Sequence, residues 1–325
     1  MSHAARPRIF IQEVAVRDGF QIEPRFVPTE EKIALIDSLS RCGLAKVEVT
    51  SFSSPKAIPM LADAETVMRG IERVEGVEYA ALVPNLRGCE RALACNVDEI
   101  NLVMSASESH NRANLAMGCD DSLGQFAKIV PVAREHAAVN ASLSTAFGCP
   151  FEGVVPVQRV LDLLGRFVDL GIARVSLCDT TGMANPAQVE DLFSAVLRAW
   201  PTLQVTAHFH NTRGMGLANA AAALRVGVRH FDASLGGLGG CPFAPGATGN
   251  VCTEDLVHMF DSMGCDTGVD LIRLLGVAAG LPALLGHDVP GQVLKAGPWT
   301  RRYPLPDARG PKAIDPANVC VGTPA

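Results

Sequence analysis

The hydrophobic and polar positions of the chain fall into two kinds of segment that alternate along its length. Short runs rich in apolar and β-branched residues predict strands, and longer stretches with apolar positions at helical spacing lie between them. The predicted strands are residues 9–16, 46–52, 78–83, 99–105, 139–147, 173–179, 204–210 and 230–235. The helical pattern is clearest in residues 28–41, 156–170, 186–200 and 215–226, and a proline opens three of these segments.

This regular repetition predicts one α/β domain. Each helix supplies the crossover that a parallel strand pair needs, and eight such units close most economically into a (β/α)8 TIM barrel. An open doubly wound sheet is the alternative that the pattern leaves. We expect residues 1–285 to form the barrel. Residues 286–325 are interrupted by proline and glycine and lack clear periodicity, so we expect a C-terminal extension that packs on the barrel, joins a subunit contact or is partly disordered.

Composition narrows the partners. The 325 residues carry a net charge of −6, which excludes the chain-wide basic field that binds nucleic acid or anionic membranes, so we expect a small-molecule ligand. Residues 1–8 have no apolar signal-peptide core, and no apolar run is long enough to span a bilayer. The ten cysteines are scattered without a CxxC pair, which is typical of reduced thiols in a cytoplasmic protein.

The candidate metal ligands follow predicted strands. Active-site groups of a TIM barrel lie at the carboxyl ends of its strands. His208 and His210 end the seventh predicted strand, and a period of two directs both side chains to the same face. Asp18 and Asn250 follow other strands, and a mixed set of carboxylate, imidazole and amide donors favours Mg²⁺ or Mn²⁺ over a thiolate-bound zinc.

Three further polar residues stand at strand ends. Arg17 could form a simple loop ion pair with its neighbour, or it could supply a fixed cation for an enolate oxygen. Glu48 lies between apolar residues of a strand, so we expect it to face the barrel interior, where a carboxylate needs a partner. Asp179 precedes Thr-Thr-Gly and is equally suited to catalysis and to capping a loop.

The glycine-rich segment 236–240 does not have the spacing of a dinucleotide or P-loop motif. We interpret it as a mobile flap that brings the thiol of Cys241 to the site, where it could move a proton. We expect the other nine cysteines to be ordinary thiols. We also expect no role for the remaining histidines, which are His3, His110, His136, His230, His258 and His287.

At these positions the chain resembles the 3-hydroxy-3-methylglutaryl-CoA (HMG-CoA) lyase family. That family lies in the metal-dependent TIM-barrel superfamily that includes isopropylmalate, homocitrate and citramalate synthases. The resemblance covers nearly the whole barrel through Arg-Asp-Gly-Phe-Gln at 17–21, Val-Thr-Ser-Phe at 49–52, Pro-Asn at 84–85, Gly-Cys-Pro at 148–150 and Asp-Thr at 179–180. It is sharpest in the cysteine loop at 236–243 and in Thr-Gly-Asn at 248–250, which distinguish lyases from synthases.

The resemblance implies roles residue by residue. It implies that Asp18, His208, His210 and Asn250 bind the divalent metal and that Arg17 contacts the thioester carbonyl. It implies catalytic or orienting roles for Glu48, Asp179, Cys241 and Glu254, with His208 and Asp179 as candidates for the general base. The chain departs from the family pattern at Phe20, Ile22, Asn211 and Arg213, which flank the metal ligands and bear on substrate specificity.

The resemblance implies a reaction as well. We expect an acyl-CoA substrate, HMG-CoA, and retro-Claisen cleavage to acetyl-CoA and acetoacetate by a homodimer or higher homo-oligomer that acts in leucine degradation or ketone-body formation. A lyase for a related 3-hydroxyacyl-CoA is the first alternative. A Claisen synthase acting on a 2-oxo acid, a pyruvate-dependent aldolase and a catalytically inactive barrel follow in that order.

Overall fold

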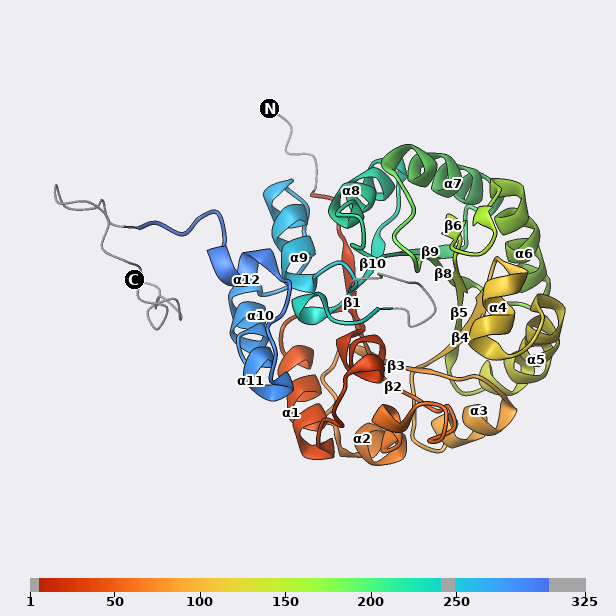
Figure 1. The fold of residues 1–325 in the computed structure, drawn as a ribbon, viewed down its shortest axis with the longest axis horizontal. Coiled ribbons are helices and arrows are strands. Elements are labelled where there is room, and N and C mark those ends of the chain that lie inside the picture. Colours follow the sequence, from red (N-terminus) through yellow and green to blue (C-terminus); the bar gives the residue numbers. More distant parts are fainter. Residues whose placement is uncertain (1–5, 241–248, 304–325) are drawn as a thin grey trace.

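The structure, a computed structural model that describes residues 6–240 and 249–303, is a closed barrel of eight parallel strands (Figure 1). Around the barrel the order is β1-β10-β9-β8-β5-β4-β3-β2. The predicted TIM barrel is confirmed, and the open sheet is excluded. The strands are β1 (Phe10–Glu13), β2 (Lys46–Ser51), β3 (Glu78–Leu82), β4 (Glu99–Ser105), β5 (Ala138–Ser144), β8 (Arg174–Asp179), β9 (Gln204–Phe209) and β10 (His230–Ala233).

Six strands end one to three residues earlier than the sequence predicted, and two of these ends matter for the site. The segment predicted at 9–16 stops at Glu13, whose carboxylate accepts a 2.8 Å hydrogen bond from the backbone N–H of Ala15. The chain then enters a π-helical turn, η1 (Ala15–Gly19). The segment predicted at 204–210 stops at Phe209, and His210 instead forms an isolated antiparallel bridge with Asn250.

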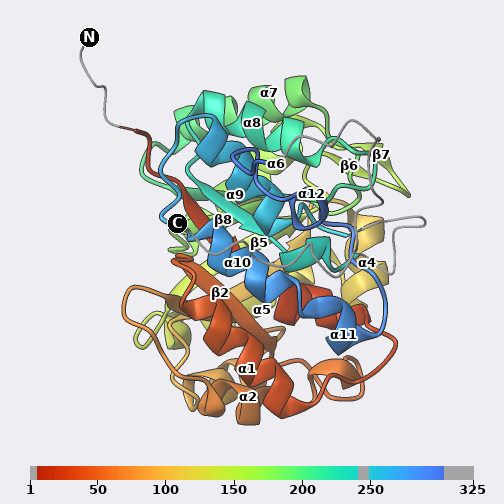
Figure 2. The same cartoon turned by 90° about the vertical axis from the view of Figure 1, so that its left-hand side faces the viewer.

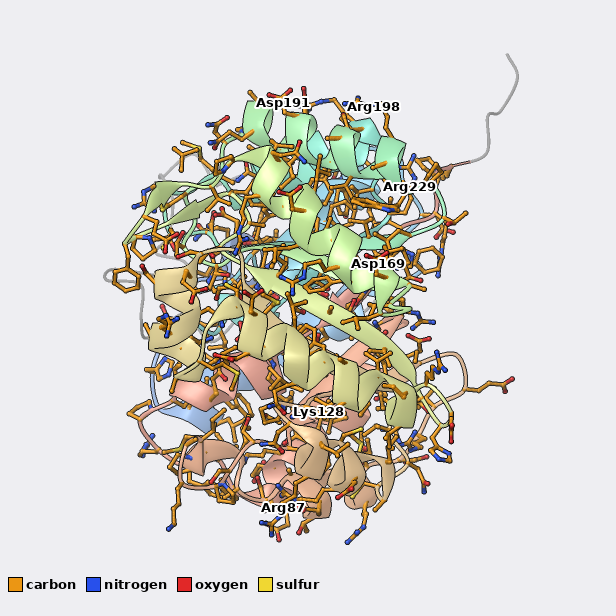
Figure 3. The ribbon with its side chains drawn as sticks, turned by 90° about the vertical axis from the view of Figure 1, so that its right-hand side faces the viewer. Arg87, Lys128, Asp169, Asp191, Arg198 and Arg229 are labelled. Carbon is orange, nitrogen blue, oxygen red and sulfur yellow. The ribbon has the colours of Figure 1, made fainter. Side chains whose placement is uncertain are left out.

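Helices form a ring around the barrel (Figure 1), with charged residues such as Lys128, Asp191 and Arg198 on the outer surface (Figure 3). No helix among the described residues is long and apolar enough to cross a membrane. The helical elements are η2 (Phe20–Ile22), α1 (Thr29–Ser40), η3 (Pro59–Leu61), α2 (Ala64–Gly70), α3 (Leu86–Leu93), α4 (Glu108–Leu115), α5 (Cys119–Ala133), α6 (Val157–Asp169), α7 (Pro186–Ala199), α8 (Gly216–Val226), η4 (Leu235–Gly237), α9 (Thr253–Ser262), α10 (Leu271–Ala278), α11 (Leu281–Leu285) and α12 (Gln292–Ala296). A short hairpin of β6 (Gly148–Cys149) and β7 (Gly153–Val154) follows β5.

The main apolar core lies between the strands and the helices, where residues such as Ile11, Val47 and Phe193 are fully buried. The barrel interior is polar instead. At the amino ends of the strands, Lys46 Nζ lies 2.6 Å from Glu99 Oε1. Arg174 Nη1 contacts Glu99 Oε2 at 2.8 Å and Glu78 Oε2 at 2.9 Å. We call Lys46, Glu78, Glu99 and Arg174 the lower ion network. It closes the barrel at the end opposite the candidate site.

The last described helices complete the ring. Helix α10 packs against α9 and also against α1, so that a late helix lies beside an early one (Figure 2). Helix α12 packs on α9, where the carboxylate of Asp255 accepts hydrogen bonds from the backbone N–H groups of Gln292 and Val293. Residues 286–303 therefore contact the barrel. The boundary between a barrel at 1–285 and an extension at 286–325 stays a prediction.

Candidate active site

A cavity of about 560 Å³ opens at the carboxyl ends of the strands. Its lining comes from loops and strands that are distant in the sequence, as expected for the working face of a TIM barrel. Polar groups at its floor include Arg17, Asp18, His208, His210 and Asp232. The cavity therefore brings together four of the predicted site residues, which are Arg17, Asp18, His208 and His210.

Three predicted metal ligands meet in this cavity. Asp18, His208 and His210 are buried, and each offers a ligand atom within 4.8 Å of the others. The two imidazoles lie with ring centroids 5.2 Å apart because their positions differ by one strand period. This set joins the π-helical turn after β1 to the end of β9, which come close because β10 pairs with both strands in the closed barrel.

Asn250 completes the donor set. Its Nδ2 donates to Asp18 Oδ2 at 2.7 Å and to the carbonyl of Leu238 at 3.0 Å. Its Oδ1 is buried and has no hydrogen-bond partner among the described residues. A buried acceptor without a partner is uncommon, and an amide oxygen beside a carboxylate and two imidazoles is a suitable ligand for a hard divalent cation. The residues present therefore fit the metal that the sequence predicted.

Arg17 connects the metal ligands to the barrel interior. Its Nη1 donates to Asp18 Oδ1 at 2.6 Å, and its Nε donates to Glu48 Oε2 at 2.5 Å. Burial raises the pKa of Asp18, but the charges of Arg17, His208 and His210 outweigh this effect and lower it to about 2. Asp18 is therefore ionised at neutral pH, as a metal ligand must be.

Glu48 faces the interior, as its sequence context predicted. Burial raises its pKa, while Arg17 and a 2.7 Å hydrogen bond from Asn101 Nδ2 to Oε1 oppose that shift. With its Nε and Nη1 groups engaged, Arg17 has an Nη2 group that lacks a partner within the part of the chain that the structure describes. Arg17 lines the cavity, so this group is available to an anionic oxygen.

Asp232 is a site residue that the sequence analysis missed. It lies opposite His208 in the register of β10 and β9, and its Oδ2 is 3.3 Å from His208 Nδ1. Burial lowers the pKa of His208, but the hydrogen bond and charge of Asp232 raise it overall. A partner on Nδ1 leaves Nε2 as the nitrogen that can bind a metal. Asp232 follows His230 by two residues, so strand alternation could have identified it as facing inward.

Comparison with known proteins agrees with this geometry. The HMGL-like family matches residues 8–280. The chain belongs to the HMGL-like family. It is 46% identical to hydroxymethylglutaryl-CoA lyase YngG of Bacillus subtilis, over 89% of this chain and 97% of that protein. It is 42% identical to (R)-citramalyl-CoA lyase of Chloroflexus aurantiacus, over 89% of this chain and 95% of that one.

A solved member of the HMGL-like family has nearly the same fold. It is an HMG-CoA lyase from Acinetobacter baumannii in complex with coenzyme A and 3-methylmalate. This structure superposes with a TM-score of 0.90 at 50% identity, covering 94% of this chain and all of that one. The suspected family resemblance is confirmed over the whole barrel.

Two predicted site residues have structural partners outside the cavity lining. Asp179 Oδ1 accepts hydrogen bonds from the backbone N–H groups of Met183 and Ala184, at 2.8 and 3.1 Å, and burial raises its pKa to about 6. These contacts favour the loop-capping alternative. Glu254 Oε2 accepts a 3.1 Å hydrogen bond from the backbone N–H of Gly236 and thereby holds the start of the glycine-rich segment. Cys241 lies outside the described residues, and its role stays a prediction.

The residues that depart from the family pattern differ in whether they line the cavity. Ile22 lines the cavity and is 42% exposed. Phe20 is buried in the core, and Arg213 donates to the carbonyls of Thr181 and Gly182. Of these three positions, Ile22 is the one in contact with the space where a substrate of an HMGL-like enzyme would lie.

One of the cysteines that we expected to be ordinary lies beside the candidate site. Cys178 lines the cavity between the metal ligands and β5. Burial raises the pKa of its thiol well above the usual value, which keeps the thiol protonated and makes it a poor nucleophile.

The histidines for which we expected no role include His230, whose ring stacks on Phe10 with centroids 4.6 Å apart.

Proposed function

We propose that this protein is a divalent-metal-dependent lyase that cleaves HMG-CoA to acetyl-CoA and acetoacetate. The observation that carries the proposal is the meeting of Asp18, His208 and His210 beside Arg17 in one cavity, with Asn250 hydrogen-bonded to Asp18. The relatives that match most of the chain include named HMG-CoA lyases, and one of them binds coenzyme A, which supports an acyl-CoA substrate.

The metal would be held by Asp18, His208, His210 and the free Oδ1 of Asn250. When bound, Mg²⁺ or Mn²⁺ lowers the pKa of the substrate's tertiary hydroxyl and polarises a neighbouring substrate oxygen. The carboxylate of Asp18 is held ionised for this purpose by the positive charge of Arg17 beside it.

The chain's own residues then move one proton off the substrate and one onto the product. A base removes the proton of the tertiary hydroxyl, and the resulting oxygen anion forms the ketone C=O bond of acetoacetate at C3. The bond between C2 and C3 breaks at the same time, and its electron pair becomes the enolate of acetyl-CoA. Arg17 Nη2 donates to the enolate oxygen as its charge develops, which stabilises the transition state more than the ground state. His208 and Asp179 stay the two candidate bases. His208 lines the cavity, but a ring nitrogen that binds the metal cannot also accept the proton, and the carboxylate of Asp179 accepts hydrogen bonds from backbone N–H groups.

The enolate carbon must finally gain a proton from the opposite side of the site. Our candidate donor is Cys241, because a thiol on a glycine-rich flap could enter when the flap closes. Cys241→Ser should keep full Mn²⁺ affinity and lower kcat at least tenfold. An unchanged kcat would remove the thiol from the mechanism.

A second candidate substrate is citramalyl-CoA, because a lyase named for it is 42% identical to this chain. Citramalyl-CoA lacks one methylene between the carbinol carbon and the free carboxylate, and cleavage gives pyruvate in place of acetoacetate. A Claisen synthase is the weaker alternative, because the named relatives that cover most of the chain are lyases.

A product assay decides between these reactions. The purified protein, stripped with EDTA and reloaded with Mn²⁺ or Mg²⁺, is given HMG-CoA or citramalyl-CoA, and acetyl-CoA, acetoacetate and pyruvate are measured separately. We expect acetoacetate, none of it before metal is restored. Full turnover in verified metal-free protein would refute the metal mechanism, and pyruvate release alone would assign the second substrate.

We also propose that the enzyme works in the cytoplasm as a homodimer or higher homo-oligomer, in leucine degradation or ketone-body formation. The eight described cysteines are free, which is in keeping with a reducing compartment. Light scattering would measure the assembly, and cell fractionation would test the location.

A further inference from the structure

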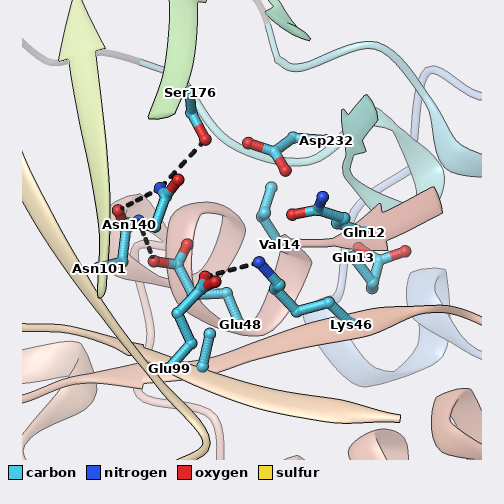
Figure 4. A pocket seen from close by; sticks show the side chains of 11 residues that line it. Gln12, Glu13, Val14, Lys46, Glu48, Glu99, Asn101, Asn140, Ser176 and Asp232 are labelled. Atoms are coloured by element: carbon cyan, nitrogen blue, oxygen red, sulfur yellow. Dashed lines mark hydrogen bonds and ion pairs between the residues drawn. The ribbon is translucent and has the colours of Figure 1, made fainter. Parts of the chain in front are cut away.

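A chain of polar side chains runs around the inside of the barrel beneath the cavity and ends at Arg17. Asn140 Nδ2 donates to Ser176 Oγ at 3.1 Å and to Asn101 Oδ1 at 2.9 Å. Asn101 Nδ2 donates to Glu48 Oε1 at 2.7 Å, and Glu48 Oε2 accepts from Arg17 Nε. We call these five residues the interior relay. Figure 4 shows its members from Ser176 to Glu48 turned toward one another across β8, β5, β4 and β2.

The strand register fixes the direction of the relay. Asn101 and Asn140 are register partners on β4 and β5, so their amides meet inside the barrel. Asn101 Oδ1 accepts two hydrogen bonds, one from Asn140 and one from Ser142 Oγ at 2.8 Å. Because the oxygen is engaged on that side, the Nδ2 group of Asn101 must face Glu48.

Asn101 lines the active-site cavity on one side and a smaller polar chamber, shared with Glu48, on the other. The polar chamber below Glu48, which Asn101, Asn140 and Ser176 also line, has a volume of about 10 Å³. That volume holds about one water molecule. Glu48 is 4% exposed, so its Oε1 depends on Asn101 for a donor.

We propose that Asn101 is a positioning residue that acts through Glu48 to hold the Arg17 guanidinium in the orientation that receives the enolate oxygen. The inference rests on the proposed function, because it needs Arg17 to face the thioester. With Asn101 in place, Glu48 keeps one oxygen on the amide and presents the other to Arg17 Nε, which directs Nη2 to the cavity. Without that donor, Glu48 is free to rotate and Arg17 loses its fixed direction.

The test is Asn101→Leu, which keeps the side-chain size and excludes water but cannot donate. Leaving a buried acceptor without its donor should lower kcat roughly 10- to 100-fold. KM and Mn²⁺ affinity should stay within about threefold, because the loss falls on the transition state. The matched control is Thr206→Val, an isosteric change inside the barrel outside the relay, with kcat expected within twofold.

A double-mutant cycle separates positioning from general structural damage. In a Glu48→Gln background, Asn101→Leu should cost less than about threefold further in kcat, because both changes break the same connection. Additive losses, or a wild-type kcat in Asn101→Leu alone, would overturn the proposal. If Asn101→Leu fails to fold, Asn140→Ser is tested in its place. We expect a smaller fall in kcat for Asn140→Ser, and an unchanged kcat would contradict the proposal.

A crystal structure of Asn101→Leu tests the relay independently of the substrate. We expect the Glu48 carboxylate to rotate and its contact with Arg17 Nε to be lost. If that contact is unchanged, the relay proposal fails even when the protein cleaves HMG-CoA. If wild-type protein cleaves neither thioester but the variant shows the rotation, the proposed substrate fails and the relay stands.

Discussion

The two ends of the barrel interior carry similar residues with opposite consequences. In the lower ion network, two acids, Glu78 and Glu99, face two bases, Lys46 and Arg174, so the charges cancel within the protein. At the candidate site, which we call the upper group, the permanent positive charge of Arg17 stands among the carboxyl groups of Asp18, Glu48 and Asp232, with two imidazoles beside them.

The difference shows how one barrel separates stability from binding. Most of these side chains are withdrawn from water, although Glu78 is 41% exposed, and a buried ion needs a partner to offset its desolvation. The lower ion network finds its partners inside the chain and closes on itself. The upper group has more carboxyl groups than permanent cations, and Asn250 Oδ1 has no donor in the described part of the chain. We propose that a cation from solution completes it.

The sharpest way to break this comparison is to remove the cation of the upper group. Arg17→Met should lower kcat roughly a thousandfold or more, equivalent to ~4 kcal/mol of transition-state stabilisation. Steady-state acetyl-CoA release measures it, and Arg198→Met on the exposed surface of α7 is the control. A kcat near the wild-type value would exclude the role of Arg17 at the enolate.

Removing a cation from the lower ion network should lower the free energy of unfolding and leave catalysis almost unchanged. Lys46→Met leaves Glu99 with one cation in place of two, and we expect about 3 kcal/mol less free energy of unfolding with kcat within threefold. Urea denaturation measures the loss. Arg41→Met, which removes an exposed ion pair with Glu72, should cost under ~1 kcal/mol. If Lys46→Met reduced kcat in stable protein, the two ends would not be separate.

The smallest effect is expected at Glu13, the last residue of β1. It is fully buried and accepts hydrogen bonds from Ala15, Leu235 and Thr253, but burial raises its pKa to about 7. The folded state therefore binds this proton more tightly than the unfolded state, so the stability it gives is present below pH 4.5 and is lost as the pH rises through 7.

Glutamine does not titrate, so Glu13→Gln should remove the part of the pH dependence of stability that comes from this carboxyl group. Between pH 5 and 8, the unfolding free energy of the wild type should fall by about 2 kcal/mol more than that of Glu13→Gln. Urea titrations at several pH values measure the difference, and the exposed Glu31→Gln should track the wild type throughout. Parallel pH curves for the wild type and Glu13→Gln would contradict the prediction.

Much of the architecture could be predicted from the sequence because it depends on local periodicity. Eight strands and their crossovers follow from patterns within short windows, and the rule that barrel sites lie at carboxyl ends gathers residues from those strands. The meeting of Asp18, His208 and His210 follows from these two principles alone.

What escaped prediction depends on relations between strands. Asp232 meets His208, and Asn101 meets Asn140, because of the register between neighbouring strands, which a single sequence does not encode in any local pattern. The early end of β1 at Glu13 has a similar origin, since that carboxylate binds Leu235 and Thr253 from the other end of the chain.

The single π-helical turn after β1 has a consequence for how this enzyme can change. Arg17 and Asp18 are adjacent in that turn, so the group proposed to meet the substrate's oxygen and the group proposed to grip the metal share one stretch of backbone. A substitution that shifts the turn moves both at once. Substitutions at the cavity rim, at positions such as Ile22, can therefore change the substrate preference more easily than substitutions in the π-helical turn itself.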